Sequence, residues 1–323
     1  MPYSWAAQTP LSNFETRLDN SFRERTDPAL TVKFTLIPDQ GNSEPTKLLV
    51  WTTTPWTLPS NLALSVRADF DYAVMHRDGE RWVLAASAIE RYVRELKGFK
   101  QIETIKGSEI VGRRYLPLFP FFSDAANSFA VFSGDFVSAD EGTGIVHIAP
   151  GFGEEDLELG KSHGLPVIVP VDAAGAFTDQ VPDYAGQNVI LEANGNISRD
   201  LKLKGVVVRH EQYRHNYPHC WRTDQPLIYM AINSWYLEAS RFRDRMTDLN
   251  GGIHWVPAHV RDGLSGNWLA NARDWNISRN RFWGAPIPVW KRNDPRYPRI
   301  DVYGSLTRSR EISAFGLRIC TGR

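Results

Sequence analysis

Short stretches in which apolar and polar residues alternate predict most of the strands of this chain. In one of them Val32, Phe34 and Leu36 share a face. In another place Asp78-Gly79, a dipeptide typical of tight hairpin turns, separates two such stretches. The predicted strands cover residues 30–37, 47–53, 72–75, 81–85, 129–132, 144–148, 167–171 and 206–210.

Helical spacing of apolar residues is found between and after these strands. In residues 87–96, Ile89, Tyr92 and Leu96 recur at intervals of three and four, and Gly98 follows them. Residues 154–162 begin with three acidic side chains, which favours a helix start. Beyond Tyr229 the pattern is amphipathic and mostly helical. We therefore predict one mixed α/β domain up to about residue 214, followed by a segment of different character.

Composition is that of an ordinary globular protein, with 42% apolar and 23% charged residues. Lys plus Arg equals Asp plus Glu at 37 each, which excludes a uniformly basic nucleic-acid binder but leaves room for a local patch. No apolar run approaches the roughly 20 residues that span a bilayer. No signal peptide is visible, and two cysteines cannot form a disulfide framework. We expect a cytoplasmic protein with no membrane partner.

The first candidate site is the string Trp51-Thr52-Thr53-Thr54-Pro55-Trp56-Thr57. Hydroxyls before a proline are also typical of capping and turn chemistry, and composition alone favours that interpretation. However, four threonines and two tryptophans around one turn are unusual for architecture. Threonine hydroxyls can hold ribose oxygens or a water, and tryptophan can stack on a base.

The second candidate runs from Gly142 through Gly144 and His147 to Asp156. It lacks the third glycine of a dinucleotide fingerprint and the Gly-Lys-Ser/Thr of a phosphate-binding loop. The glycines allow backbone N–H groups to approach a ligand, whereas His147 and Asp156 are expected at a strand end and in the first turn of a helix. Ordinary structural roles for this pair remain the favoured alternative.

Two further groups of residues carry weaker signals. His210, His215, His219 and Cys220 lack the paired spacing of a zinc site, and Pro218 disfavours a shared helix, so no metal is predicted. The string 274–288, with arginines between aromatic residues, suits either a nucleic-acid face or a solvated surface. No serine or cysteine nucleophile with a nearby histidine stands out.

These motifs resemble the isoleucyl-tRNA synthetases, and specifically their inserted editing domain. Valyl and leucyl relatives differ where Thr54 and Trp56 stand here. The likeness extends to about Gly304 and fades beyond it, so we expect a fragment of a longer enzyme. The matching segments are residues 2–15, 52–57, 142–156, 217–235 and 274–288.

The resemblance implies a distorted β-barrel flanked by helices that receives the misacylated 3′ end of a tRNA. Residues 1–28 would lead into the insertion, residues 29–215 would form the editing domain, and residues 216–323 would return to a Rossmann-like catalytic core. The implied reaction hydrolyses valine wrongly esterified to isoleucine tRNA, and valyl-adenylate. Such hydrolysis is needed because isoleucine and valine differ by one methylene, which changes the binding free energy in a pocket by only about 1–3 kcal/mol. The limit is well known for this pair of amino acids.

The resemblance also assigns roles to individual residues. Asp156 matches the carboxylate that holds the substrate's α-ammonium, and His147 matches the residue that helps to exclude isoleucine. Thr52, Thr53 and Thr54 match hydroxyls around the terminal adenosine and the attacking water. The further positions expected to bind substrate are Trp51, Trp56, Thr57, Gly142, Gly144 and, in the synthetic pocket, Trp283. We expect no side-chain general base.

The chain departs from the family in two ways. Some members hold a zinc ion with two CxxC pairs, but the matching positions here are Ser4, Ala7, Cys220 and Thr223, so zinc is not expected. The HIGH-type and KMSKS-type signatures are also missing. ATP and Mg²⁺ would therefore serve only the parent enzyme, and editing would need no cofactor. The expected partners are the 3′ end of tRNA(Ile), a valine ester or valyl-adenylate, and the rest of the synthetase.

Three hypotheses remain open from the sequence. The chain is an autonomous editing hydrolase, or a non-enzymatic tRNA-contacting remnant of a split or truncated synthetase. The third hypothesis is a small-molecule esterase, which is disfavoured because the sequence shows no nucleophile paired with a general base.

Overall fold

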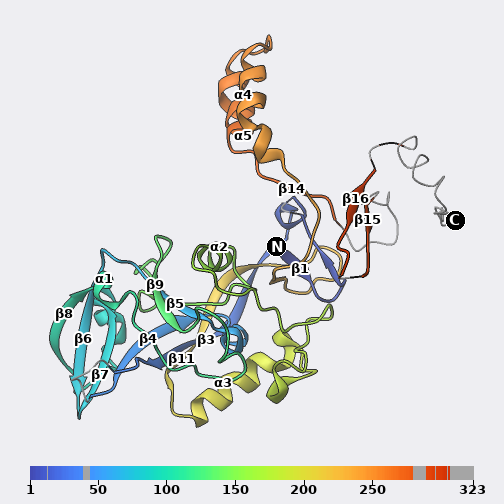
Figure 1. The fold of residues 1–323 in the computed structure, drawn as a ribbon. Helices are drawn as coiled ribbons and strands as arrows, with labels where there is room; N and C mark the ends of the chain where they lie inside the picture. The colour runs from blue at the N-terminus through green and yellow to red at the C-terminus, as the bar shows by residue number, and fades with distance from the viewer. Residues whose placement is uncertain (13, 39–43, 279–288, 295, 304, 306–323) are drawn as a thin grey trace. The chain divides into compact units, whose positions relative to one another are not determined.

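The structure is a computed structural model that describes residues 1–12, 14–38, 44–278, 289–294, 296–303 and 305 (Figure 1). The chain divides into two compact units, Met1–Asn233 and Ser234–Arg323, and each is described by itself. In the described part of the chain, no helix is both long enough and apolar enough to cross a lipid bilayer.

A six-stranded sheet is the largest element of the first unit (Figure 1). Neighbouring strands run antiparallel except for one parallel pair, β4 and β7. In spatial order the strands are β11 (Val207–Pro218), β3 (Phe22–Thr35), β4 (Thr46–Thr52), β7 (Glu80–Ala85), β6 (Asp71–Arg77) and β8 (Lys100–Lys106). The sheet has two edges, β11 and β8, so the mixed α/β class is confirmed with open sheets, and no closed barrel is found among the described residues.

Two smaller sheets complete the strands of this unit. In the first, β5 lies between an antiparallel and a parallel neighbour. Its order is β10 (Ile145–Ile148), β5 (Ala63–Val66), β9 (Ala130–Ser133). The second joins the start of the chain to a segment more than two hundred residues later. Its order is β12 (Ile228–Tyr229), β1 (Pro2–Ser4), β2 (Thr9–Pro10).

The helices of the first unit are short. The α-helices are α1 (Gly107–Ile110), α2 (Glu154–Ser162) and α3 (Asn194–Leu203). Short segments of tighter or wider helix lie between these elements: η1 (Glu15–Arg17), η2 (Pro55–Ser60), η3 (Ala86–Tyr92), η4 (Pro182–Tyr184) and η5 (Val189–Ala193). Helix α2 has the bounds predicted from its acidic start.

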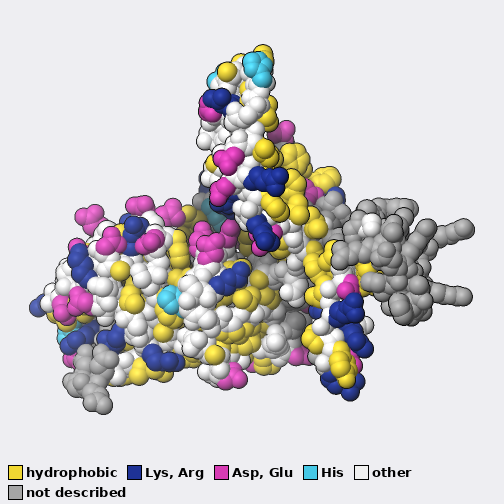
Figure 2. Space-filling view, turned by 45° about the horizontal axis from the view of Figure 1, so that its top comes forward, with side chains coloured by type: hydrophobic (Ala, Val, Ile, Leu, Met, Phe, Trp, Pro, Cys, Tyr) yellow, Lys and Arg dark blue, Asp and Glu magenta, His cyan; other side chains and the backbone are white. Residues whose placement is uncertain are grey.

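The predicted faces and hairpin are confirmed. Val32, Phe34 and Leu36 are all buried in the main hydrophobic cluster. Asp78 and Gly79 adopt φ values of 52° and 77°, as a two-residue turn between β6 and β7 requires. On the face shown in Figure 2, acidic and basic side chains both occur and neither sign covers the surface, as expected for a chain with no net charge.

Two predicted elements differ in the structure. Residues 167–171 are not a strand, and Val167 is 46% exposed. Pro166 precedes this stretch and Pro170 lies within it, and neither has an N–H to donate to a sheet, so the apolar run does not pair as a buried strand. Residues 87–96 form the 3₁₀ turn η3 and further turns, because apolar spacing over so few residues does not distinguish the two helix types.

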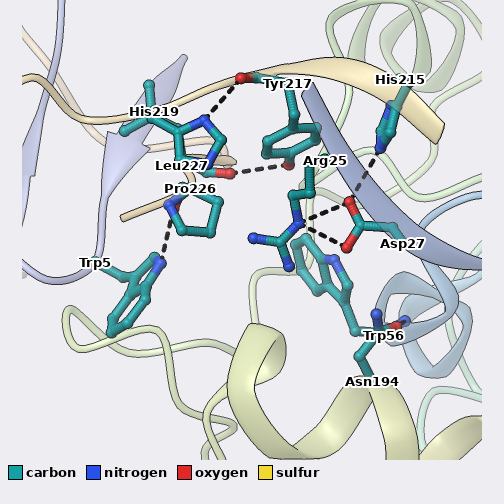
Figure 3. Close-up of polar contacts among 10 residues, drawn as sticks. All are labelled: Trp5, Arg25, Asp27, Trp56, Asn194, His215, Tyr217, His219, Pro226 and Leu227. Carbon is teal, nitrogen blue, oxygen red and sulfur yellow. Dashed lines mark hydrogen bonds and ion pairs between the residues drawn. The ribbon is translucent and has the colours of Figure 1, made fainter. Parts of the chain in front are cut away.

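The far ends of β3 and β11 form a two-stranded ribbon with a polar cluster on one face (Figure 3). The Asp27 carboxylate accepts hydrogen bonds from Arg25 Nε at 2.7 and 2.8 Å and pairs with His215 Nε2 at 3.0 Å. His219 Nδ1 lies 2.8 Å from the backbone oxygen of Tyr217. Each of these two histidines therefore has a partner within the protein, and His215 lies in β11 and His219 just after it, not in the disfavoured helix.

The second unit contains little buried surface among its described residues. Only Ala239 and Asn250 are buried there, whereas Val256, Leu264 and Trp268 are exposed. Its elements are β13 (Tyr236–Leu237), η6 (Ala239–Phe242), α4 (Arg243–Gly251), η7 (Arg261–Ser265), α5 (Gly266–Ala270), β14 (Trp275–Asn276), β15 (Val289–Lys291) and β16 (Ile300–Val302). Of the predicted return segment, residues 216–323, the parts at 279–288 and 306–323 lie outside the described residues.

Candidate functional site

The threonine string forms a turn at the end of strand β4. Pro55 fixes the first position of η2, where a missing N–H costs nothing, so the chain reverses immediately after Thr54. Thr52 Oγ1 accepts a hydrogen bond from the Thr54 N–H at 3.1 Å and lies 3.3 Å from Thr54 Oγ1. Thr54 Oγ1 in turn lies 3.3 Å from Thr57 Oγ1. Three of the predicted hydroxyls therefore form one connected network.

His147 joins this network from strand β10. Its Nε2 atom lies 3.0 Å from Thr57 Oγ1. The Thr57 hydroxyl donates its hydrogen to the Thr54 backbone oxygen at 2.8 Å, so it must accept from His147, which places the imidazole proton on Nε2. Burial lowers the pKa of His147 to about 4, and the ring is therefore neutral near pH 7.

The other ring nitrogen of His147 faces no hydrogen-bond partner. His147 Nδ1 is buried, and within the described residues nothing donates to it. In the neutral form fixed by Thr57 this nitrogen carries a lone pair. A buried acceptor without a partner is costly, so the position is one where a ligand group or a water would be favoured.

Asp156 lies in the first turn of α2. Its Oδ2 atom accepts a hydrogen bond from the Ala149 N–H at 2.8 Å, two residues beyond His147. Burial raises the pKa of Asp156 to about 6; the Ala149 hydrogen bond opposes this effect and the charge of Glu155 adds to it. A Cβ at Gly153 would lie 2.9 Å from Asp156 Oδ1, so the residue before the helix has no room for a side chain. The site thus holds a half-buried carboxylate that is largely ionised near neutral pH.

Trp56 connects the threonine turn to the segment that carries Asp156. Its ring packs edge-on against Phe152, with centroids 4.9 Å apart. Its backbone N–H donates to Asn194 Oδ1 at 3.2 Å, at the start of α3. Asn194 was not predicted from the sequence, because its only signal is a polar residue at a helix start. Trp56 is itself buried in the hydrophobic core.

Trp51, Gly142 and Gly144 form a second group beside the network. A Cβ at Gly142 would lie 2.9 Å from Trp51 Cβ, and one at Gly144 would lie 2.5 Å from Ala85 Cβ, so both glycines permit close packing. Both also adopt positive φ. Trp51 Nε1 donates to Glu211 at 3.2 Å. These contacts explain the residue types structurally, and substrate binding by this group stays a prediction.

Two predicted positions remain outside both groups. Thr53 is half-buried, and its hydroxyl has no hydrogen-bond partner in the part of the chain that the structure describes, so it is free to meet a ligand. Trp283 lies outside the described residues.

The four positions that match a family zinc site come together but do not suit a metal. Cys220 supplies one thiol, Ala7 has no donor atom, and hydroxyls such as that of Ser4 are not ligands of structural zinc. Ser4 Oγ accepts from the Ala7 N–H at 3.2 Å. Burial alone would raise the pKa of the Cys220 thiol, but hydrogen bonds from Ser4 and from the N–H groups of Arg222 and Thr223 lower it below its ordinary value. Hydrogen bonds satisfy this thiol where a metal ion would otherwise do so.

The arrangement suits electrostatic positioning rather than covalent catalysis. The Thr57 hydroxyl donates to a carbonyl oxygen and not to His147, so the two do not form a nucleophile and base pair. A carboxylate can hold an ammonium group, a neutral imidazole can bound a pocket, and hydroxyls can orient a water or a ribose. An ester that is already activated needs little more than this.

Comparison with known proteins identifies the family of this chain. The model of the class I tRNA synthetases (I, L, M and V) matches residues 1–306. The isoleucine–tRNA ligase of Rickettsia felis is 54% identical over 323 residues, covering 95% of this chain and 29% of the ligase. That of Rickettsia typhi is 52% identical, covering 99% of this chain and 31% of the ligase. The chain thus spans less than a third of the length of these relatives.

Among solved structures, the crystal structure of GlLeuRS-CP1 aligns with a TM-score of 0.45 and 14% identity, over 57% of this chain and 98% of that one. The editing domain of the P. knowlesi cytosolic leucyl-tRNA synthetase aligns with a TM-score of 0.34 and 11% identity, over 42% and 62%. Because the family model covers all but the last residues, this protein belongs to the class I tRNA synthetases of the isoleucine, leucine, methionine and valine group.

Proposed function

We propose that this chain carries an aminoacyl-tRNA editing site that hydrolyses valine wrongly attached to isoleucine tRNA, together with valyl-adenylate. The observation that carries the proposal is the network of Thr52, Thr54, Thr57 and His147, with the half-buried Asp156 carboxylate held by the N–H two residues beyond the histidine. The identity to isoleucine–tRNA ligases supports isoleucine tRNA as the partner.

The chemistry follows from the side chains present. Asp156 would hold the α-ammonium of the esterified amino acid. The hydroxyls of the threonine turn would hold the terminal ribose and the attacking water. His147, neutral and fixed by Thr57, would bound the pocket and select against the larger isoleucine side chain. The ester itself supplies the leaving group, so the step requires no side-chain nucleophile, and we propose no metal or cofactor for it.

Release of valine from Val-tRNA(Ile) tests the proposal, with Ile-tRNA(Ile) measured beside it. We expect valine to be released at least tenfold faster than isoleucine, and the Asp156→Ala variant to lose that release. Glu158→Ala in the same helix is the matched control and should keep full activity. Equal release by the Asp156→Ala variant would contradict the assignment.

A second candidate function is a non-enzymatic module that contacts tRNA. It is favoured by one observation, that the chain spans less than a third of its relatives and carries no HIGH or KMSKS string in its sequence. In this case the folded chain would bind tRNA(Ile) without releasing valine, and addition of the remaining portion of the synthetase would restore release. Neither candidate forms aminoacyl-tRNA, so we expect no isoleucine-dependent exchange of pyrophosphate into ATP.

A further inference from the structure

A cavity of about 540 Å³ opens on the first unit, and none of its lining residues belongs to the threonine–histidine network. Its volume lies within the range of small-molecule sites. Its walls combine two arginines, two phenylalanines and two serines: Arg67, Arg91, Phe70, Phe136, Ser87 and Ser138. No role has been given to these residues by the proposed function.

The two guanidinium groups are fixed by backbone oxygens. Arg67 Nη1 donates to the Asp135 oxygen at 3.0 Å. Arg91 Nη2 donates to the oxygens of Ala139 at 2.5 Å and of Gly142 at 3.3 Å. Arg67 also pairs with Asp69 at 3.2 Å, whereas Arg91 has no carboxylate partner among the residues that the structure describes. Arg91 is therefore a preorganised positive charge that is not neutralised.

The cavity contains one carboxylate that could oppose an anion. Asp140 lines it, and its Oδ2 accepts a hydrogen bond from the Ser138 hydroxyl at 3.0 Å. Asp69 does not line the cavity but offsets the charge of Arg67, so the Arg91 guanidinium is the cation that remains available to an anion. Planar guanidinium groups bind phosphate through paired hydrogen bonds, which makes a phosphate the most suitable anion.

Aromatic rings stand next to these cations. The Arg67 guanidinium lies 5.1 Å from the centroid of the Phe70 ring. The Phe136 ring is 39% exposed, and a Cβ at Gly134 would lie 2.6 Å from it, so the glycine makes room for the ring. A phosphate site with accessible aromatic rings is the combination that single-stranded nucleic acids use, because bases stack on such rings.

One loop joins this cavity to the candidate editing site. Residues 137–140 line the cavity, Gly142 packs on Trp51, and the loop continues into β10 with His147. Arg91 holds this loop through the oxygens of Ala139 and Gly142.

We propose that the cavity binds a phosphate of the single-stranded 3′ end of tRNA, from a nucleotide that precedes the terminal adenosine. This inference rests on the proposed editing function. The same chemistry would accept AMP, the nucleotide released from valyl-adenylate, so the test separates the two sources. Arg91 makes the principal phosphate contact and Arg67 assists it.

Isothermal titration calorimetry of the full chain tests the binding. The ligands are the trinucleotide CCA, AMP and inorganic phosphate. We expect CCA to bind more tightly than AMP or phosphate, and Arg91→Gln to weaken CCA binding at least tenfold. Arg94→Gln is the matched control, because Arg94 is exposed, lies three residues further on and does not line the cavity. Arg67→Gln provides a second variant if Arg91→Gln disturbs the loop, and its CCA affinity should also fall. Unchanged CCA affinity in both arginine variants would overturn the proposal, and tighter binding of AMP than of CCA would overturn its RNA source.

Failure of the editing function is distinguishable from failure of this inference. In deacylation, Arg91→Gln should raise KM for Val-tRNA(Ile) and leave kcat nearly unchanged, whereas Asp156→Ala should lower kcat and keep CCA affinity. Loss of all valine release with CCA binding that still depends on Arg91 would reject the editing function alone. Normal valine release with CCA affinity and KM unaffected by both arginine variants would reject the phosphate site alone.

Discussion

At the scale of single residues, the half-buried charge of Asp156 carries a cost in the folded state. Its carboxylate accepts from the Ala149 N–H, but burial outweighs this effect and raises the pKa of Asp156 to about 6. A carboxyl whose folded pKa is raised holds its proton more tightly in the folded state. Stability therefore falls as pH rises from about 4 to about 6, and the full penalty is present above that range. Such a penalty is tolerated where a cationic ligand removes it.

Asp156→Asn should make the unliganded chain more stable at neutral pH. The amide oxygen can still accept from Ala149, and the buried charge is gone. We expect a gain of about 1–3 kcal/mol in the free energy of unfolding at pH 8, since one pKa unit corresponds to about 1.4 kcal/mol. Urea unfolding at pH 8 and pH 5 measures it, and the gain should be smaller at pH 5. An Asn variant that is equally or less stable than wild type at pH 8 would show that the charge carries no penalty.

Thr57→Val should destabilise the threonine–histidine network. The substitution keeps the shape but removes the acceptor of the His147 proton, which leaves a buried ring nitrogen unpaired, whereas the Thr54 oxygen still accepts the Thr57 N–H at 2.9 Å. We expect a loss of about 1–3 kcal/mol in the free energy of unfolding. Thr26→Val, on an exposed position of β3, is the matched control and should change stability by less than about 0.5 kcal/mol. Equal effects of the two substitutions would contradict the network.

Sequence patterns identified the residues of the candidate site better than their partners. Thr57 and His147 were both named, but the bond between them depends on the pairing of β10 with β5, which no local pattern specifies. The partner of Asp156 is a backbone N–H, which has no signature in a sequence. Arg91 was not named at all, because a single arginine in an amphipathic stretch resembles any solvated residue.

At the scale of elements, the sequence predicts best those elements whose structure depends only on neighbouring residues. The acidic start of α2 and the Asp78-Gly79 turn specify their structures without distant contacts. The pairing of β11 with β3 joins segments that are far apart in sequence, so contacts such as that between Asp27 and His215 form only on folding and leave no local pattern. The strand predicted at residues 167–171 is wrong, because Pro166 before it and Pro170 within it outweigh its apolar composition.

The segments around Cys220 allow a prediction about zinc binding. The chain as it stands should bind no stoichiometric zinc, because its matching positions hold a single thiol. A variant with Ser4→Cys, Ala7→Cys and Thr223→Cys would present two CxxC pairs, and we expect it to bind one zinc ion and to unfold at a Tm several degrees higher with zinc than with EDTA. Zinc content after gel filtration and thermal unfolding measure this. A double variant with Ser4→Cys and Ala7→Cys alone should bind zinc more weakly, and stoichiometric zinc in the unaltered chain would refute the premise.

At the scale of the whole molecule, the two units differ in how they are stabilised. All members of the three hydrophobic clusters formed by the described residues lie in the first unit, which also contains the candidate site and the arginine cavity. The described part of the second unit buries little apolar surface. Since burial of apolar surface is the main favourable term in folding, the first unit should account for nearly all of the folding free energy.

A chain that ends at Asn233 should therefore fold as well as the full chain. It keeps β1 and β12, whose pairing holds the start of the chain, and it removes exposed apolar residues such as Trp268. We expect its urea midpoint to match that of the full chain, its m-value to be unchanged or slightly lower, and its aggregation to be reduced. As a matched control, a chain that ends at Arg222 lacks β12 and should unfold at a lower midpoint. If the chain ending at Asn233 fails to unfold cooperatively, the second unit contributes stability that its exposed side chains do not suggest, and the first unit is not self-sufficient.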